Sequence, residues 1–365
     1  MGWTGNKIKE LASNNGISIT KIADLVEVSR QTVNDWINGQ IPKGNHLLEL
    51  SKILNVSPNI FFSKIEDKNI IIPLHRVRNN SKITDKVQKE ALELVEEFKL
   101  FFKNSKIPPV LPVIRLSKID EKRAEEIAKE LKENIEYKDI APINFDKTFK
   151  LLEMLGIYLV FANFPPKVKS YAFFTKIYGN RVVFINNNTN IIDLIFPLLH
   201  EAIHAVRDEL TSEMGYDENE EELCDEIASH IQFSDEYISL VYNAIKGLPN
   251  AIQVKKLKDF GKEYKHSLHG VVKRIKKIDD KFALEVGGAD SNLKKPFPTI
   301  GEIRNKARTP RELIVFEKIY SPHFLKSLLE QVDNLSDRKL AFLLGIEENL
   351  DIIEIRKELK VFGEK

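Results

Sequence analysis

Strand-forming sequence is confined to one window of the chain, residues 156–185. Branched and aromatic residues fill 156–161, 172–177 and 181–185, and the segment 178–180 is typical of a hairpin turn. Elsewhere, apolar residues recur at helical spacing. Because so few residues favour strands, only a small sheet can form. We therefore predict an α+β, mostly helical chain, with an N-terminal helical bundle, a middle region that holds the sheet, and a helical C-terminal region.

The composition excludes several classes of protein. The single cysteine, Cys224, rules out an intrachain disulfide framework and a zinc site built on cysteines. No apolar stretch approaches the roughly 18 residues of a membrane span, and the first residues lack the apolar region of a secretory signal. The net charge of +1 argues against a chain that binds polyanions with its whole surface. We expect a cytoplasmic protein without membrane contact.

Residues 19–38 carry the pattern of two short helices that cross over a tight turn. Ser29 suits the N-cap of the second helix. The inward positions are apolar or small: Ile22, Ala23, Val26, Val33 and Trp36. The outward face of the second helix carries side chains that can pair with base edges or phosphates in a major groove. These candidate DNA contacts are Arg30, Gln31, Thr32 and Asn34.

This pattern resembles the Cro/C1-type (XRE) helix-turn-helix family of phage repressors over residues 4–62. The resemblance implies double-stranded DNA as a partner. Glu27 departs from the family, which often has glycine in the turn. Acidic and basic residues nearly cancel in this block, so attraction to phosphates is weak and DNA binding should need a homodimer. The alternative is a small helical bundle that binds another protein.

The strongest chemical signal is an H-E-x-x-H motif inside an apolar helix. His200 and His204 are one helical turn apart, so both imidazoles can reach one metal ion. Glu201 lies beside them and can act as the general base that takes a proton from a water activated by the metal. The alternative, two histidines on a solvated face, fits poorly because the flanking residues are apolar.

A catalytic zinc also needs a third protein ligand and one open position. Glu221 fits on a following helix, and Asp225, one turn later, can accept the N–H of a ligating histidine. The neighbouring acidic residues Glu218, Glu220 and Glu222 remain rival ligands. We interpret Cys224, between them, as a buried inert thiol. The ligand types favour Zn²⁺, with Mn²⁺ or Fe²⁺ less favoured.

Together these features resemble the ImmA/IrrE family of metallopeptidases, zincins with a glutamate third ligand. The resemblance covers about residues 118–285 and includes segments 124–131, 151–157, 181–186 and 260–275. Two positions depart from the family. Ile203 stands where glycine is usual, and Cys224 stands where alanine is usual. Neither change removes a ligand.

The resemblance implies a DNA-associated zinc endopeptidase that cleaves a specific partner protein, a helix-turn-helix repressor. The alternative is an XRE-type transcriptional regulator or toxin–antitoxin component, with an antitoxin-like partner and a metal site that is structural or sensory. A hydrolase of another class is a third reading. For the peptidase, a free hairpin edge beside the metal would let an extended substrate add as a strand.

We predict four segments along the chain. Residues 1–65 form the helix-turn-helix DNA-binding domain, and 66–117 form a helical linker. Residues 118–285 form the metallopeptidase domain. Residues 286–365 form a helical region whose role the sequence does not assign.

Overall fold

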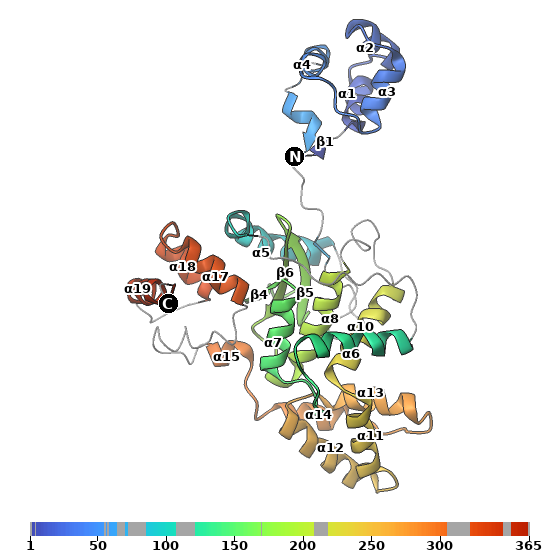
Figure 1. Ribbon diagram of the computed structural model, residues 1–365, viewed down its shortest axis with the longest axis vertical. Helices are drawn as coiled ribbons and strands as arrows, with labels where there is room; N and C mark the ends of the chain where they lie inside the picture. The colour runs from blue at the N-terminus through green and yellow to red at the C-terminus, as the bar shows by residue number, and fades with distance from the viewer. Residues whose placement is uncertain are drawn as a thin grey trace. The chain divides into compact units, whose positions relative to one another are not determined.

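The structure is a computed structural model that describes residues 2–3, 5–54, 56, 58–63, 70–71, 85–106, 121–168, 170–207, 218–304, 322–345 and 352–363 (Figure 1). The chain divides into two compact units, residues 1–68 and 69–365. Each unit is described by itself.

The N-terminal unit is a bundle of short helices. Its elements are β1 (Gly2–Trp3), α1 (Asn6–Asn14), α2 (Ile19–Leu25), α3 (Arg30–Ile37), α4 (Gly44–Ile53), the 3₁₀ helix η1 (Pro58–Phe61) and β2 (Phe62–Ser63). Ser18 and Ser29 begin α2 and α3, because each hydroxyl accepts a hydrogen bond from the backbone N–H three residues later, at 3.1 and 3.0 Å. The five inward positions predicted from the sequence are all buried.

A small sheet organises the second unit. Its strands are β3 (Ile70–Ile71), β4 (Ile157–Ala162), β5 (Ala172–Ile177) and β6 (Asn180–Asn186), in the order β3-β5-β6-β4. Strands β5 and β6 form an antiparallel hairpin, and β4 runs parallel to β6. Tyr178 and Gly179 turn the hairpin with φ of 49° and 83°, as expected of a two-residue connection.

Both faces of this sheet are buried under helices. Consecutive strand residues are apolar, and successive side chains point to opposite faces of the sheet. Leu159, Phe174 and Val183 face one layer, and their neighbours Val160, Phe173 and Phe184 face the other. The first layer contains α6 (Glu121–Asn134), α7 (Phe145–Met154), α8 (Ile195–Val206) and α10 (Glu218–Gln232). The second contains α5 (Asp85–Lys103), α17 (Pro322–Gln331), α18 (Asp337–Leu344) and α19 (Ile352–Gly363) (Figure 1).

Helix α5 lies in the segment for which the sequence predicts a helical linker. Its apolar face, including Val95, Phe98 and Phe102, packs in the same cluster as α17, α18 and α19. The second layer is therefore assembled from segments that lie before and after the metal-site region in the sequence. The three linker prolines, Pro108, Pro109 and Pro112, lie outside the described residues.

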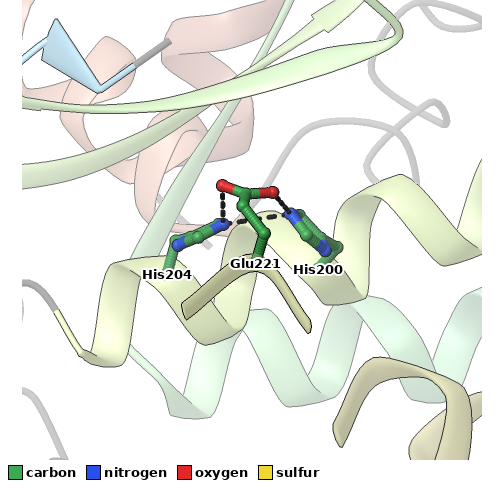
Figure 2. Close-up of side chains that lie close together, drawn as sticks. All are labelled: His200, His204 and Glu221. Carbon is green, nitrogen blue, oxygen red and sulfur yellow. Dashed lines mark hydrogen bonds and ion pairs between the residues drawn. The ribbon is translucent and has the colours of Figure 1, made fainter. Parts of the chain in front are cut away.

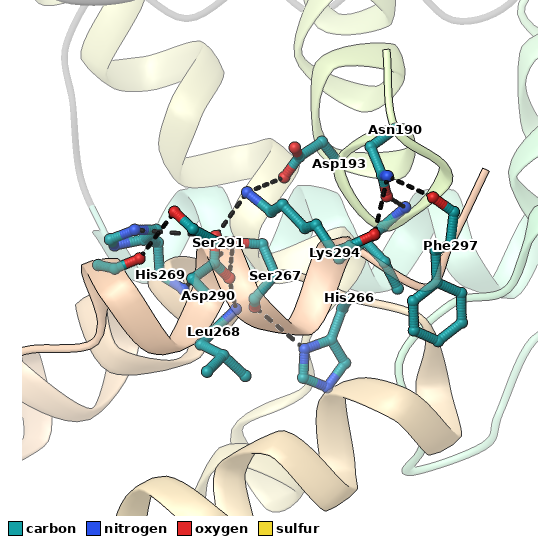
Figure 3. Close-up of polar contacts among 12 residues, drawn as sticks. Asn190, Asp193, His266, Ser267, Leu268, His269, Asp290, Ser291, Lys294 and Phe297 are labelled. Atoms are coloured by element: carbon teal, nitrogen blue, oxygen red, sulfur yellow. Dashed lines mark hydrogen bonds and ion pairs between the residues drawn. The ribbon is translucent and has the colours of Figure 1, made fainter. Parts of the chain in front are cut away.

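A third cluster forms from α11 (Asp235–Ile245), α12 (Asn250–Tyr264), α13 (Leu268–Ile278) and α14 (Gly287–Lys294). The short α15 (Ile300–Arg304) follows and contributes Ile300 to the first layer. Buried Asp290 accepts hydrogen bonds from Leu268 N at 2.7 Å and Ser267 Oγ at 2.9 Å (Figure 3). Lys294 Nζ lies 2.5 Å from Asp290 Oδ2 and 2.7 Å from Asp193 Oδ1, so this lysine joins the two carboxylates. Since Asp193 belongs to η2 (Ile191–Asp193), directly before α8, this network fixes α13 and α14 relative to the start of α8.

The predicted fold class is confirmed: a mostly helical α+β chain with a small sheet, N-terminal helix-turn-helix helices and a helical C-terminal region. One expectation is met only in part. At the hairpin edge proposed for an added substrate strand, β3 occupies two of the six residues of β5, since Ile70 and Ile71 pair with Thr175 and Phe174. Among the described residues, no helix combines the length and the apolarity needed to cross a membrane.

Candidate metal centre and nucleic-acid interface

Helix α8 carries the H-E-x-x-H motif through the interior of the second unit. Nearly all of its residues are buried, because apolar side chains surround the motif on the remaining faces of the helix. His200 is 0% exposed, Glu201 1% and His204 2%. Polar side chains buried this completely need partners. The motif therefore does not lie on a solvated face, and the alternative of two surface histidines is excluded.

Helix α10 packs along α8 and supplies partners for the two histidines. Glu221 Oε2 lies 3.2 Å from His200 Nε2, and Glu221 Oε1 lies 3.2 Å from His204 Nε2 (Figure 2). The two Nε2 atoms are 3.0 Å apart. Ligands about 2.0–2.2 Å from one tetrahedral ion lie about 3.3–3.6 Å from one another. The three donor atoms thus already have nearly the spacing that a metal ion requires, and their N, N, O chemistry suits zinc.

The structure also separates Glu221 from its rivals. Glu220 is bound by Arg207, whose Nε and Nη2 donate to its two carboxylate oxygens at 2.5 and 2.6 Å. Glu222 is exposed. The side chain of Glu218 lies outside the described residues. Of the acidic candidates whose side chains are described, Glu221 is the one within 3.2 Å of both histidines.

The site strongly favours an ionised Glu221. Burial opposes ionisation, yet hydrogen bonds from His200 and His204 and the charge of both rings hold the pKa of Glu221 far below its usual range. The carboxylate is consequently negative at any physiological pH. Two imidazoles and one carboxylate give the charge and donor set of a divalent-cation site.

Asp225 lies beside His200 on the side opposite the ligand position. Its Oδ1 lies 2.9 Å from His200 Nδ1, and its Oδ2 lies 3.2 Å from Lys273 Nζ on α13. A carboxylate beside Nδ1 would leave the Nε2 lone pair available to a metal ion. The sequence predicts this role for Asp225. It gives no sign of Lys273, which is distant in the chain.

A cavity of about 370 Å³ opens beside the same side chains. Its walls come from the start of α8, from α10 and from the start of α13, and they are mainly apolar and aromatic, including Phe196, Pro197 and Phe233. Asp225 lines it, and the Phe196 ring centroid lies 6.5 Å from that of His200. The sequence patterns do not predict this cavity. Phe196, one turn before His200, is the local signal that could have pointed to it.

In the N-terminal unit, α3 presents the predicted DNA contacts unequally. Arg30 and Gln31 are exposed, whereas Thr32 and Asn34 are half-buried. Gln31 Nε2 donates to Asp35 Oδ1 at 2.9 Å, and the Thr32 and Ser29 hydroxyls are 2.8 Å apart. The Thr32 hydroxyl therefore belongs to the N-cap of α3, which leaves Arg30 and Gln31 as the accessible pair.

Comparison with known families supports the N-terminal assignment. Residues 8–61 match the model of a helix-turn-helix family. No curated protein matches the chain. Geometry and family match agree, so this unit is a helix-turn-helix domain of the XRE type, a class that binds double-stranded DNA.

Proposed function

We propose that the second unit is a zinc-dependent endopeptidase that cleaves a specific partner protein, and that the helix-turn-helix domain localises it to DNA. The observation that carries this proposal is the convergence of His200, His204 and Glu221 in a buried cluster, with Glu201 on the same helix. The resemblance to ImmA/IrrE peptidases suggests a helix-turn-helix repressor as the substrate.

Each side chain has a distinct role in this proposal. His200, His204 and Glu221 hold the ion, and Asp225 keeps the His200 ring in place. When bound, the ion polarises a peptide carbonyl and lowers the pKa of a coordinated water toward neutrality. The Glu201 carboxylate would accept a proton from the attacking water and later give it to the leaving amine. The cavity beside His200 receives a side chain of the substrate.

The direct test replaces Glu201 by glutamine. Because Glu201 is not one of the three clustered ligands, Glu201→Gln should keep about one zinc per chain, measured by elemental analysis. Proteolysis should fall by about 10²- to 10⁴-fold, measured by mass-spectrometric mapping of new protein N-termini in cells. Glu222→Gln, an exposed neighbour on α10, is the matched control. Identical N-termini in cells with wild-type chain and Glu201→Gln would rule out proteolysis as the function.

The alternative is an XRE-type regulator or toxin–antitoxin component whose metal site is structural or sensory. The helix-turn-helix domain at 8–61 favours it. In this case Arg30→Ala combined with Gln31→Ala should abolish specific DNA binding and the cellular phenotype, while Glu201→Gln should leave both intact. Lys52→Ala, an exposed cation on α4, is the control for lost charge. Specific DNA binding retained by the double variant would contradict this reading.

A further inference from the structure

Cys224 lies against the second metal-binding histidine. The thiol is fully buried, and its Sγ is 3.4 Å from His204 Nδ1. The other ring nitrogen of His204, Nε2, faces Glu221 at 3.2 Å. Cys224 therefore contacts His204 in the way that Asp225 contacts His200, at the nitrogen that is not available to the ion.

The thiol also has a partner on its other side. Cys224 Sγ–H donates to Glu220 Oε1 at 3.8 Å, a distance suited to sulfur. Arg207, itself 2% exposed, holds both oxygens of Glu220. The result is a continuous chain of buried polar groups from Arg207 through Glu220 and Cys224 to His204.

Two functions are conceivable for this group, because His204 Nδ1, Glu220 and Cys224 could themselves ligate a cation. The Arg207 guanidinium decides between them. It is permanently charged and donates to both Glu220 oxygens, so the positive charge that a cation would supply is already present. A cation would have to displace a buried arginine. The group is therefore better suited to hold His204 than to bind a second ion.

We infer that Cys224 is a positioning residue for His204: its sulfur accepts the Nδ1–H, and its S–H is anchored by Glu220 and Arg207. This inference rests on the proposed metal centre. With Nδ1 protonated, the Nε2 lone pair of His204 points at the ion. The ligand helix thus orients both histidines, His200 through Asp225 and His204 through Cys224. The buried cysteine is then part of the metal centre and not an inert core residue.

Zinc affinity of the full chain tests this role without reference to proteolysis. Competition with a chromogenic chelator should show zinc binding weakened about 10- to 100-fold in Cys224→Ala. Cys224→Ser keeps a donor and an acceptor and should recover most of the affinity. Ile227→Val removes a similar volume from the same buried helix and should bind like wild type. In the zinc-loaded wild type, ¹⁵N NMR should show His204 protonated at Nδ1.

The outcomes separate this inference from the proposed function. Wild-type affinity in Cys224→Ala overturns the inference alone, and Glu201→Gln still tests proteolysis. A serine variant as weak as the alanine variant overturns it as well, since lost packing would then explain the effect. Weakened zinc binding without any cleavage supports the inference and defeats the peptidase. A second zinc equivalent that is lost in Cys224→Ala overturns positioning in favour of a second cation site. A wild-type chain without zinc defeats both.

Discussion

Glu27 occupies the turn between α2 and α3 in a left-handed conformation, with φ of 59°. An L-residue with a side chain is strained there by about 1–2 kcal/mol, whereas glycine is not. We expect Glu27→Gly to stabilise the N-terminal unit by about 0.5–1 kcal/mol. Denaturant unfolding followed by tryptophan fluorescence measures this, because both tryptophans, Trp3 and Trp36, lie in this unit.

The control for Glu27→Gly is the same substitution at exposed Asp24, inside α2. Glycine there should destabilise the unit by about 0.3 kcal/mol, since the backbone is already helical and glycine has a lower helix propensity than aspartate. Equal effects at both positions would show that charge, and not backbone conformation, governs the turn.

The sequence predicts the role of a single residue when that role depends on residues close to it in the chain. The spacing of Glu221 and Asp225 along one helix predicts which carboxylate faces the histidines, and the structure brings those side chains together. The pairing of Glu220 with Arg207 and the contact of Cys224 with His204 both require the packing of α10 on α8. No local pattern in the sequence indicates either contact.

At the scale of elements, α8, α10 and α13 together shape the cavity beside His200. Ser229 of α10 lines this cavity and is 8% exposed. Ser229→Leu should fill part of it and lower kcat/KM for the natural substrate by about 10- to 200-fold, because a lost apolar subsite contact is worth about 1–3 kcal/mol. Steady-state kinetics on an identified substrate peptide measures this.

Zinc affinity should be unchanged in Ser229→Leu, since Ser229 is not one of the three clustered ligands. Glu222→Leu adds the same side chain at an exposed position of α10 and is the control. Unchanged kinetics in Ser229→Leu would mean that the cavity does not receive the substrate.

The third helical cluster has a buried histidine that resists protonation. His266 accepts a hydrogen bond from Tyr237 OH at 2.7 Å on Nε2, and its Nδ1 lies 3.1 Å from Ser267 O. Burial lowers the pKa of His266 to about 4. The unfolded chain, with a histidine pKa of about 6.5, binds this proton first as the pH falls. The contribution of neutral His266 to stability is therefore complete above about pH 6.5 and is lost between about 6.5 and 4.

We expect the free energy of unfolding of the second unit to fall by about 1.4 kcal/mol per pH unit in this window from His266 alone. His266→Gln should remove that contribution to the slope of unfolding free energy against pH. The control is His269→Gln, at an exposed position, which should leave the slope unchanged. Urea unfolding followed by far-UV circular dichroism at pH 7, 6 and 5 measures the slopes. Parallel curves for wild type and His266→Gln would contradict the assignment.

Elements with strong local patterns were predictable, and those defined by distant pairing were not. The hairpin β5–β6 follows from alternation around a two-residue turn. Strand β3 consists of two isoleucines, Ile70 and Ile71, whose partners in β5, Thr175 and Phe174, lie far later in the sequence. No local pattern therefore indicates this pairing. This is why the hairpin edge was expected to be free.

At the scale of the whole molecule, the chain combines two separately compact units. Fragment 69–365 should bind zinc with the affinity of the full chain, because all three ligands lie within it. A fragment that begins at residue 107 should aggregate, because it lacks α5 and exposes the apolar face of the second layer. Chelator competition and size-exclusion chromatography measure these outcomes. A soluble, zinc-binding fragment 107–365 would show that α5 is dispensable to the fold.

The layered arrangement itself could not be derived from the sequence. The amphipathic patterns of α5 and of the C-terminal helices show that each has an apolar face. They do not show that these faces meet on one side of the same sheet. Sequence order placed these segments in a linker and in a separate C-terminal region, because apolar patterns identify a buried face but not its partner.

Because α17, α18 and α19 come late in the sequence, the second layer is completed well after the sheet during synthesis. The sheet can form once Asn186 has left the ribosome, but helices that cover Phe173 and Phe184 end only at Gly363. At typical elongation rates about 10–35 s separate the two events. Throughout that interval the helix-turn-helix domain is already complete, so this domain can fold before the second unit has finished folding.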